Sequence, residues 1–202
     1  MKYIICNLKT HLNEYNITDY LNTIKKINYN NFIICPEKKY ISLFHGFKVC
    51  TQDFYEDVKS EYTLIGHFEK HDTIEDIKEK IIKATNKKLK IILCIGNNDI
   101  EDYNSIKEQL NYYLNNINGN IIIAYEPYNM IGSINEVNID KLDVIIKKIK
   151  KDFNNITVLY GGNVNTKNIK SILQITDGVL MARMSYNPHK LTNLLNNLKK
   201  SI

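Results

Sequence analysis

Short apolar runs alternate with longer amphipathic stretches along the whole chain. Eight runs of three to five residues are rich in Ile, Val, Leu and Tyr. They are apolar on both faces, which is typical of strands buried within a parallel sheet. The predicted strands are Tyr3–Cys6, Phe32–Cys35, Phe47–Cys50, Tyr62–Ile65, Ile91–Ile95, Ile121–Tyr125, Val158–Tyr160 and Val179–Met181.

The stretches between these runs predict helices. In the stretch Thr73–Lys87, Ile74, Ile77 and Ile81 recur at the spacing of one inward-facing helical stripe. The same kind of spacing predicts helices over Thr18–Ile27, Ile106–Ile117, Ile139–Phe153, Ile169–Ile175 and Pro188–Leu198.

Polar residues mark three helix starts. Thr18 and Thr73 are each followed by acidic residues, which favours a capped N-terminus. Asn187 precedes Pro188, and proline is well suited to the first helical position.

Eight strands in alternation with helices predict a single-domain (β/α)₈ barrel over residues 1–202. The chain is short for this fold, for which about 250 residues is usual. The connection between Cys50 and Tyr62 has room for only about one turn of helix. We therefore expect a shortened loop after the third strand.

Composition and charge narrow the possible partners. The chain of 202 residues has a net charge of +5, which can attract a small anionic substrate. Its lysines are scattered along helix faces with no aromatic interleaving, so nucleic-acid binding is not expected. The sequence shows no signal peptide and no apolar run long enough for a membrane span. Four cysteines lie in strand-like runs without metal-binding spacing, which predicts reduced thiols and a cytoplasmic protein.

Chemically active side chains follow the strands, and active sites of such barrels lie at the carboxyl ends of the strands. Asn7 and Lys9 follow the first strand, His67 and Glu69 the fourth, and Glu126 the sixth. Taken singly, His67 is more often a structural histidine, and Glu126 is equally well explained as an acidic helix start. Their placement at one end of one barrel favours a proton-transfer site.

The later loops supply groups that suit an anion. Gly132 lies in the loop after the sixth strand, Asn163 follows a glycine pair after the seventh, and Ala182 and Arg183 follow the eighth. Backbone N–H groups exposed by glycine, together with a guanidinium, are suited to a phosphate.

These residues resemble the motifs of triosephosphate isomerase, in the order of that family and over nearly the whole chain. The similar segments are Asn7-Leu8-Lys9, Gly66-His67-Phe68-Glu69-Lys70, Cys94-Ile95-Gly96, Ala124-Tyr125-Glu126-Pro127 with Ile131-Gly132-Ser133, Leu159-Tyr160-Gly161-Gly162-Asn163-Val164, and Asp177-Gly178-Val179-Leu180.

The resemblance implies that the residues after the first, fourth and sixth strands interconvert two triose phosphates, a well-studied enzyme reaction. Glu126 would be the base, and neutral His67 would polarise the carbonyl and shuttle the hydroxyl proton. Lys9 would stabilise the enediolate, Asn7 would orient the substrate, and Glu69 would support His67 and Lys9.

For the phosphate, the resemblance implies donors at Gly132 and Asn163. The family's Gly-Gly pair after the last strand is Ala182-Arg183 here. Arg183 would either grip the phosphate or fill its pocket, and we favour the first. A metal or another cofactor is not expected.

Other departures concern assembly and the lid. The family's long loop after the third strand, which braces the neighbouring subunit, is missing, so we expect a monomer or a non-standard oligomer. Tyr128-Asn129-Met130 differs from the family's lid hinge, so closure is expected to be slower or less complete. Phe68 replaces a serine and Asn97 a glutamate, which weakens hydrogen bonding around the site.

Two other functions remain open at the level of sequence. The altered phosphate site would also suit another small phosphorylated aldose and ketose pair, with Arg183 as the discriminating residue. The other possibility is a non-catalytic binding protein that keeps the family's motifs. The substitutions at Phe68 and Asn97 favour this function, whereas the intact base, imidazole and lysine argue against it.

Overall fold

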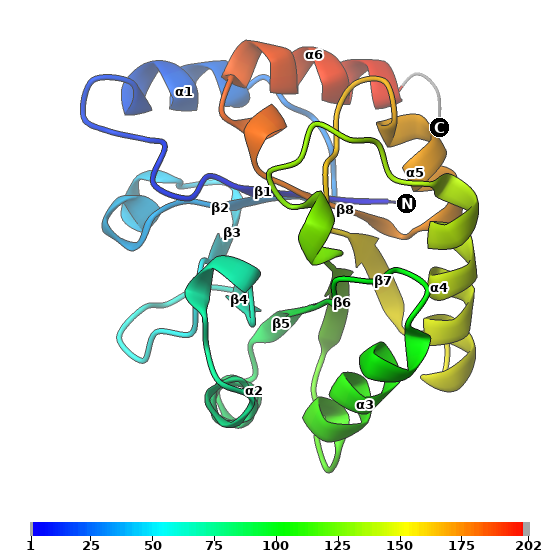
Figure 1. Cartoon of the computed structure of the whole chain (residues 1–202). Helices are drawn as coiled ribbons and strands as arrows, with labels where there is room; N and C mark the ends of the chain where they lie inside the picture. The colour runs from blue at the N-terminus through cyan, green and yellow to red at the C-terminus, as the bar shows by residue number, and fades with distance from the viewer. Residues whose placement is uncertain (1, 200–202) are drawn as a thin grey trace.

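The computed structural model describes residues 2–199 as one closed barrel of eight parallel strands (Figure 1). Each strand pairs with its neighbours in sequence, and β1 pairs with β8 to close the ring. The predicted fold is confirmed. The strands are β1 (Tyr3–Asn7), β2 (Phe32–Cys35), β3 (Lys48–Thr51), β4 (Tyr62–Ile65), β5 (Lys90–Ile95), β6 (Ile121–Tyr125), β7 (Thr157–Tyr160) and β8 (Gly178–Met181).

The strands are buried on both faces because each face packs a different apolar layer. One cluster takes alternate residues from all eight strands and fills the inside of the barrel, among them Ile5, Leu64 and Leu159. A larger cluster joins the outward-facing strand residues to the helices, as Ile4 and Ile24 illustrate. This two-sided burial explains why the strands read as continuous apolar runs.

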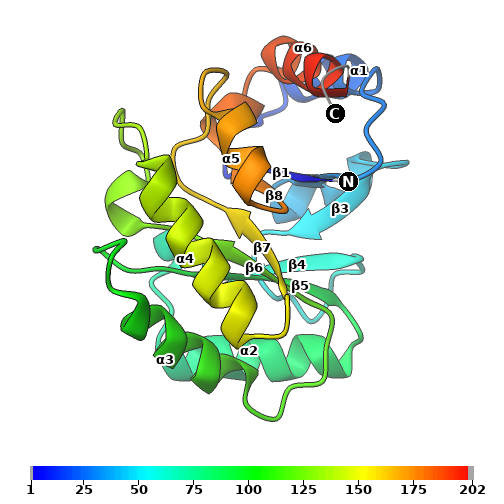
Figure 2. The same cartoon turned by 90° about the vertical axis from the view of Figure 1, so that its right-hand side faces the viewer.

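Within residues 2–199, six α-helices lie outside the strands (Figure 2). They are α1 (Ile17–Ile24), α2 (Ile74–Asn86), α3 (Tyr103–Leu114), α4 (Ile139–Asp152), α5 (Ile169–Ile175) and α6 (Pro188–Lys199). Four short 3₁₀ helices complete the chain: η1 (Lys38–Leu43), η2 (Phe68–Lys70), η3 (Tyr128–Met130) and η4 (Arg183–Ser185).

Two of the three predicted helix starts are confirmed. Thr73 forms a full capping box with Asp76, because each side chain accepts a backbone N–H of the other residue. Asn187 Oδ1 accepts the Lys190 N–H at 2.9 Å and so caps α6. The start at Thr18 is wrong: α1 begins at Ile17, whose N–H donates to the Asn13 carbonyl.

The third helix lies three residues before the predicted one at each end. Asp102 caps α3 by accepting the Ser105 N–H at 3.2 Å. The first buried residue of α3 is Ile106, so the apolar spacing does not reveal the first turn of the helix. The helix stops before Asn116, whose φ of 58° is left-handed.

The ring of helices is incomplete between β2 and β4. Only the 3₁₀ helix η1 connects β2 to β3, and residues 52–61 cross from β3 to β4 without a helix. The shortened loop after the third strand is therefore confirmed. Within the described residues, no helix has both the length and the apolarity needed to span a membrane. Cys6, Cys35, Cys50 and Cys94 are buried free thiols, as their positions in strands predict.

Candidate active site

A small cavity lies where the strands β1, β4, β6, β7 and β8 end. Its volume is about 160 Å³. Eight of the nine residues that the sequence proposes for the site line this cavity: Asn7, Lys9, His67, Glu126, Gly132, Asn163, Ala182 and Arg183. The ninth, Glu69, contacts two of the lining residues. Parallel strands bring these residues together because all their carboxyl ends meet at one rim.

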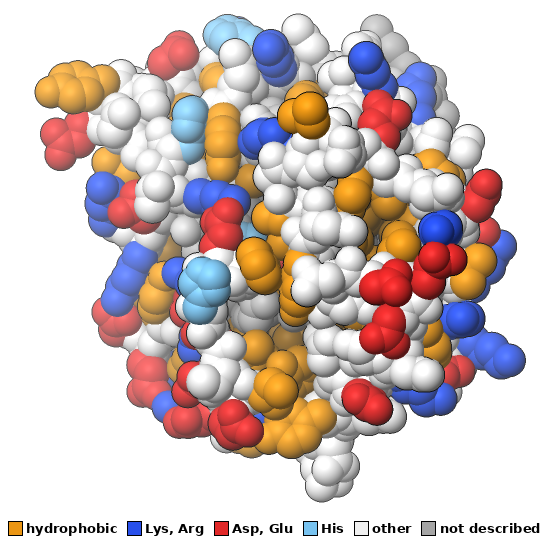
Figure 3. Space-filling view, viewed as in Figure 1, with side chains coloured by type: hydrophobic (Ala, Val, Ile, Leu, Met, Phe, Trp, Pro, Cys, Tyr) orange, Lys and Arg blue, Asp and Glu red, His pale blue; other side chains and the backbone are white. Residues whose placement is uncertain are grey.

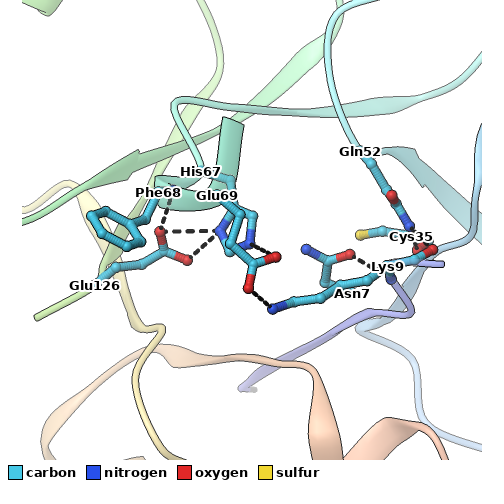
Figure 4. Close-up of polar contacts among 8 residues, drawn as sticks. All are labelled: Asn7, Lys9, Cys35, Gln52, His67, Phe68, Glu69 and Glu126. Atoms are coloured by element: carbon cyan, nitrogen blue, oxygen red, sulfur yellow. Dashed lines mark hydrogen bonds and ion pairs between the residues drawn. The ribbon is translucent and has the colours of Figure 1, made fainter. Parts of the chain in front are cut away.

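His67 and Glu126 form the centre of the site. The His67 ring nitrogen Nδ1 lies 2.8 Å from Glu126 Oε1 and 3.2 Å from Oε2 (Figure 4). The Phe68 backbone N–H donates to Oε2 at 3.3 Å, so the backbone supplies a donor where the serine side chain is absent. The chain reaches His67 through Gly66, whose φ of 77° is left-handed and suits glycine.

Glu126 is held almost out of solvent at the end of β6. Its side chain is 1 % exposed, and its backbone N–H donates to the Ile95 carbonyl at 2.8 Å. Gly161 lies directly against it, because a Cβ on Gly161 would be 2.7 Å from Glu126 Cγ. The glycine after β7 therefore makes room for the carboxylate.

His67 Nε2 is buried and has no hydrogen-bond partner among the described residues. The nearest carboxylate oxygen, Glu69 Oε2, lies 3.7 Å away, which is beyond hydrogen-bonding distance. A buried polar atom without a partner is costly. At the wall of a cavity, such an atom is a ready contact for a polar ligand.

Lys9 and Glu69 form an ion pair beside His67, joined by a hydrogen bond from Lys9 Nζ to Glu69 Oε1. Burial raises the pKa of Glu69. The hydrogen bond and charge of Lys9, with a contribution from His67, lower the pKa by more than burial raises it, so the pKa of Glu69 lies below its usual value. Glu69 is therefore held as a carboxylate that orients the ammonium.

The backbone of Lys9 is fastened in an unusual conformation. Its φ is 48°, which is uncommon for a residue with a side chain. Asn7 Oδ1 accepts the Lys9 N–H at 3.0 Å. Gln52 Nε2 donates to the Lys9 carbonyl at 2.8 Å and to the Cys35 carbonyl at 3.0 Å. Gln52 thus ties the loop after β1 to the ends of β2 and β3 (Figure 4).

Gln52 is not among the site residues expected from the sequence, because Gln52 lies in a polar segment and carries no charge. Its position did hold a signal, since Thr51 ends β3 and Gln52 follows directly at the active rim. A long amide at such a place can donate two hydrogen bonds to neighbouring loops.

Arg183 lies on the opposite side of the cavity and joins the loops after β6, β7 and β8. Its Nη2 donates to the Ser133 carbonyl and, at 3.3 Å, to Asn163 Oδ1. Asn163 Nδ2 in turn donates to the Asn135 carbonyl at 3.0 Å. Within residues 2–199, no carboxylate lies within 4 Å of Arg183. It is also the only arginine of the sequence.

The other departures from the family's pattern are accommodated locally. The ring of Phe68 packs on that of Tyr128, with centroids 4.6 Å apart. Asn97 does not contact Lys9 or His67: its Oδ1 accepts the Tyr125 hydroxyl at 3.1 Å and its Nδ2 donates to the Asp102 carbonyl at 2.8 Å. Asn97 therefore holds the loop after β5 to α3 and β6.

One group of side chains in the described part of the chain has the types and spacing to ligate a metal. His67, Cys94 and Glu126 offer ligand atoms within 4.8 Å of one another. His67 Nδ1 and Glu126 are already hydrogen-bonded. Burial, and then the nearby Glu126, raise the pKa of the Cys94 thiol well above its usual value, which disfavours the thiolate that a metal needs. The existing contact and the raised thiol pKa therefore both disfavour metal binding by this group.

The barrel and its cavity place the chain among (β/α)₈ proteins whose pocket gathers a carboxylate, an imidazole and an ammonium at the carboxyl ends of the strands. Comparisons with known proteins define the family. The family model "Triosephosphate isomerase" matches residues 49–198. A triosephosphate isomerase of Helicobacter acinonychis is 35% identical over 149 residues, which cover 67% of this chain and 63% of that protein.

Two further relatives extend the match. A triosephosphate isomerase of Campylobacter concisus is 29% identical over 189 residues, covering 81% of this chain and 83% of that protein. One of Mesomycoplasma hyopneumoniae is 30% identical over 161 residues, covering 70% of this chain and 64% of that protein. The match spans less than two thirds of the Helicobacter and Mesomycoplasma proteins. The chain belongs to the triosephosphate isomerase family.

Proposed function

We propose that this protein interconverts dihydroxyacetone phosphate and glyceraldehyde 3-phosphate by proton transfer through an enediolate. The observation that carries the proposal is the contact between a buried carboxylate, Glu126, and the imidazole of His67, with the Lys9 ammonium beside them in one cavity. Removing a carbon-bound proton leaves negative charge on two oxygens, and an ammonium and an imidazole are the groups that such charge requires.

The two nitrogens of His67 have different surroundings, and this supports a role in moving protons. Nδ1 faces Glu126 and Nε2 has no hydrogen-bond partner in the described chain. A carboxylate only accepts hydrogen bonds, so a neutral His67 donates its N–H to Glu126. A substrate that draws Glu126 toward its carbon would release that N–H, and His67 would then polarise the carbonyl and shuttle the hydroxyl proton.

Lys9, Asn7 and Glu69 complete the proposed machinery. Lys9 would stabilise the enediolate, and Glu69, held as a carboxylate by Lys9, would fix the ammonium in direction. Asn7 would orient the substrate from the end of β1 while its Oδ1 holds the Lys9 N–H. These groups need no metal and no other cofactor for the proposed reaction.

The phosphate would lie against Gly132, Asn163, Ala182 and Arg183, which line the far side of the cavity. Arg183 supports the gripping role because no carboxylate neutralises it within the described residues. The cavity of about 160 Å³ is smaller than the about 300–1,000 Å³ of typical ligand pockets. Its size favours a three-carbon phosphate.

The test is turnover of glyceraldehyde 3-phosphate by the purified protein and by Glu126→Gln. A general base contributes about 10²- to 10⁴-fold, so we expect a loss of this size in kcat. Glu79→Gln is the matched control, because Glu79 is an exposed carboxylate on α2 paired with Lys83. Equal turnover in Glu126→Gln and the wild type would exclude Glu126 as the base.

A second candidate is isomerisation of another small phosphorylated aldose and ketose pair. The arginine after β8, in place of the family's glycine pair, favours it because a flexible guanidinium can meet a phosphate at a different depth. Turnover of a panel of four- and five-carbon aldose phosphates, compared with turnover of glyceraldehyde 3-phosphate, tests this candidate. A kcat/KM above that for glyceraldehyde 3-phosphate would make this the function, and lack of turnover on any of them with retained binding would leave a non-catalytic barrel.

We further propose that the protein works without the family's usual dimer. Residues 52–61 connect β3 to β4 directly and bear no long loop to reach a neighbour, and Gln52 of the same chain braces Lys9. Sedimentation equilibrium is expected to give the monomer mass of 23.6 kDa. A dimer that depends on residues 52–61 would contradict this.

A further inference from the structure

A second cavity adjoins the catalytic one on the other side of Arg183. Its volume is about 600 Å³, and Asn163, Val164 and Arg183 line both cavities. We call it the outer groove, and its polar lining residues include His11, Ser133, Asn163, Arg183, Tyr186 and Lys190. The groove runs from the loop after β1, across η4, to the first turn of α6.

The charge of the outer groove is positive. Arg183 and Lys190 line it, and no carboxylate does. Neither cation has an ion-pair partner within the described part of the chain, whereas Lys38, Lys80 and many other lysines do. Burial, and then the charge of Glu69, raise the pKa of Tyr186 in the groove wall, and Glu69 is itself paired with Lys9. Figure 3 shows Lys, Arg and His side chains in the upper part of that face, together with a few Asp and Glu side chains.

Arg183 has donors to spare. A guanidinium carries five N–H groups, and only those of Nη2 have partners here, the Ser133 carbonyl and Asn163 Oδ1. Nε and Nη1 form no hydrogen bond with any described residue. Because Arg183 lines both cavities, it can bind one anion in the catalytic cavity and another in the outer groove.

The groove is also lined by two stacked rings. The rings of His11 and Tyr186 stack with centroids 4.3 Å apart and an angle of 10° between their planes. The stack places an imidazole and a phenol hydroxyl at the groove, and both can donate to an oxyanion. Lys190 lines the outer groove and does not line the catalytic cavity.

We propose that the outer groove is a second anion-binding site, which holds a phosphoryl group beside the catalytic cavity while Arg183 bridges the two. Its ligands are small diphosphate or bisphosphorylated compounds. The second group belongs either to the molecule that occupies the catalytic cavity or to a separate effector, and both sources share this chemistry. The proposal does not depend on which isomerisation the catalytic cavity performs.

Inorganic pyrophosphate is the probe, titrated by calorimetry at low ionic strength into the wild type, Lys190→Gln and Lys167→Gln. Lys190 is exposed in the outer groove, whereas Lys167 is exposed in the loop after β7 and lines neither cavity. Both variants lower the net charge equally. We expect about tenfold weaker binding in Lys190→Gln, as for one lost charge-assisted hydrogen bond, and no change in Lys167→Gln.

The same titration in the presence of saturating 2-phosphoglycolate, a mimic of the enediolate, separates the two sources. Binding that persists and remains sensitive to Lys190→Gln identifies a separate effector site. Binding that disappears identifies a ligand that spans Arg183. Equal affinity of the wild type and Lys190→Gln, or an equal loss in Lys167→Gln, overturns the proposal. Glyceraldehyde 3-phosphate turnover by the wild type tests the catalytic proposal separately.

Discussion

The two sides of the catalytic cavity differ in how their charges are balanced. On the side of β1, β4 and β6, each charged group has a partner: Lys9 with Glu69, and Glu126 with His67. On the side of β7 and β8, the guanidinium of Arg183 meets only a carbonyl and an amide oxygen. Groups that move protons must be held in fixed directions, whereas a group that binds an incoming anion must not already hold one.

The two sides also differ in how they are fastened. Lys9 is held through its backbone by Asn7 and Gln52, so its position depends on the rim of the barrel. Arg183 is held through its side chain by residues after β6 and β7, so its direction depends on those loops. One cavity of about 160 Å³ therefore has a half whose charges are already paired and a half whose cation is open to an anion.

Removing the unpaired cation tests the comparison most strongly. Arg183→Ala is expected to raise KM for glyceraldehyde 3-phosphate about 10- to 100-fold, because hydrogen bonds to charged groups contribute about 1.5–3 kcal/mol. kcat should change much less, since Arg183 contacts neither His67 nor Glu126. Steady-state kinetics separate the two constants.

Arg183→Lys is the conservative control for this variant. It keeps the charge but loses the planar fork, so a partial rescue of KM is expected. A normal KM with a reduced kcat in Arg183→Ala would show that the residue acts on the lid and does not bind phosphate.

Gln52→Ala tests the fastened half. Without the amide, the Lys9 carbonyl loses its donor and the loop at φ 48° loses a brace. We expect kcat to fall about tenfold with little change in KM, because a shift of about 1 Å can cost up to about a hundredfold.

Two variants control this experiment. Gln52→Glu has the same length but cannot donate to two carbonyls, so it should not rescue the activity. Gln174→Ala, at an exposed amide on α5, should leave turnover unchanged. Full activity in Gln52→Ala would show that Asn7 alone suffices to hold Lys9.

The barrel could be predicted because its signals are local. Each apolar run coincides with one strand to within about one residue. Strands that are buried on both faces appear in the sequence as continuous apolar runs, without alternating polar positions. Thr73 and Asn187 cap their helices with side chains adjacent in sequence. Thr18 failed because α1 starts with a backbone contact to Asn13, which residue types do not reveal.

The predicted fold determined which residues meet at the site, but not which hydrogen bonds join them. Once the strands are known, the residues after each strand must meet at one rim, and this places His67 and Glu126 in one cavity. The pairing of Lys9 with Gln52, or of Arg183 with Ser133, links loops that are far apart in sequence. Such contacts depend on side-chain directions that periodicity does not encode.

The smallest expected effect concerns the paired half, where Glu69 is held as a carboxylate. Its pKa is lowered in the folded protein from an ordinary value of 4.5, so the unfolded chain binds the proton more readily. The stabilisation from Glu69 is therefore present above about pH 4.5 and is lost as the pH falls through the folded-state pKa. The pair is half exposed, so its contribution is expected at about 0.2–1 kcal/mol.

Urea unfolding of the wild type and Glu69→Gln from about pH 7 to about pH 3 measures this contribution. The difference in unfolding free energy should shrink toward acid pH, and also in about 1 M salt, where exposed charges are screened. Glu14→Gln is the control, because Glu14 is an exposed carboxylate without an ion-pair partner in the described chain. A difference that grows toward acid pH would show that Lys9 does not stabilise the charged form of Glu69, and the paired half would then owe its geometry to Gln52 and Asn7.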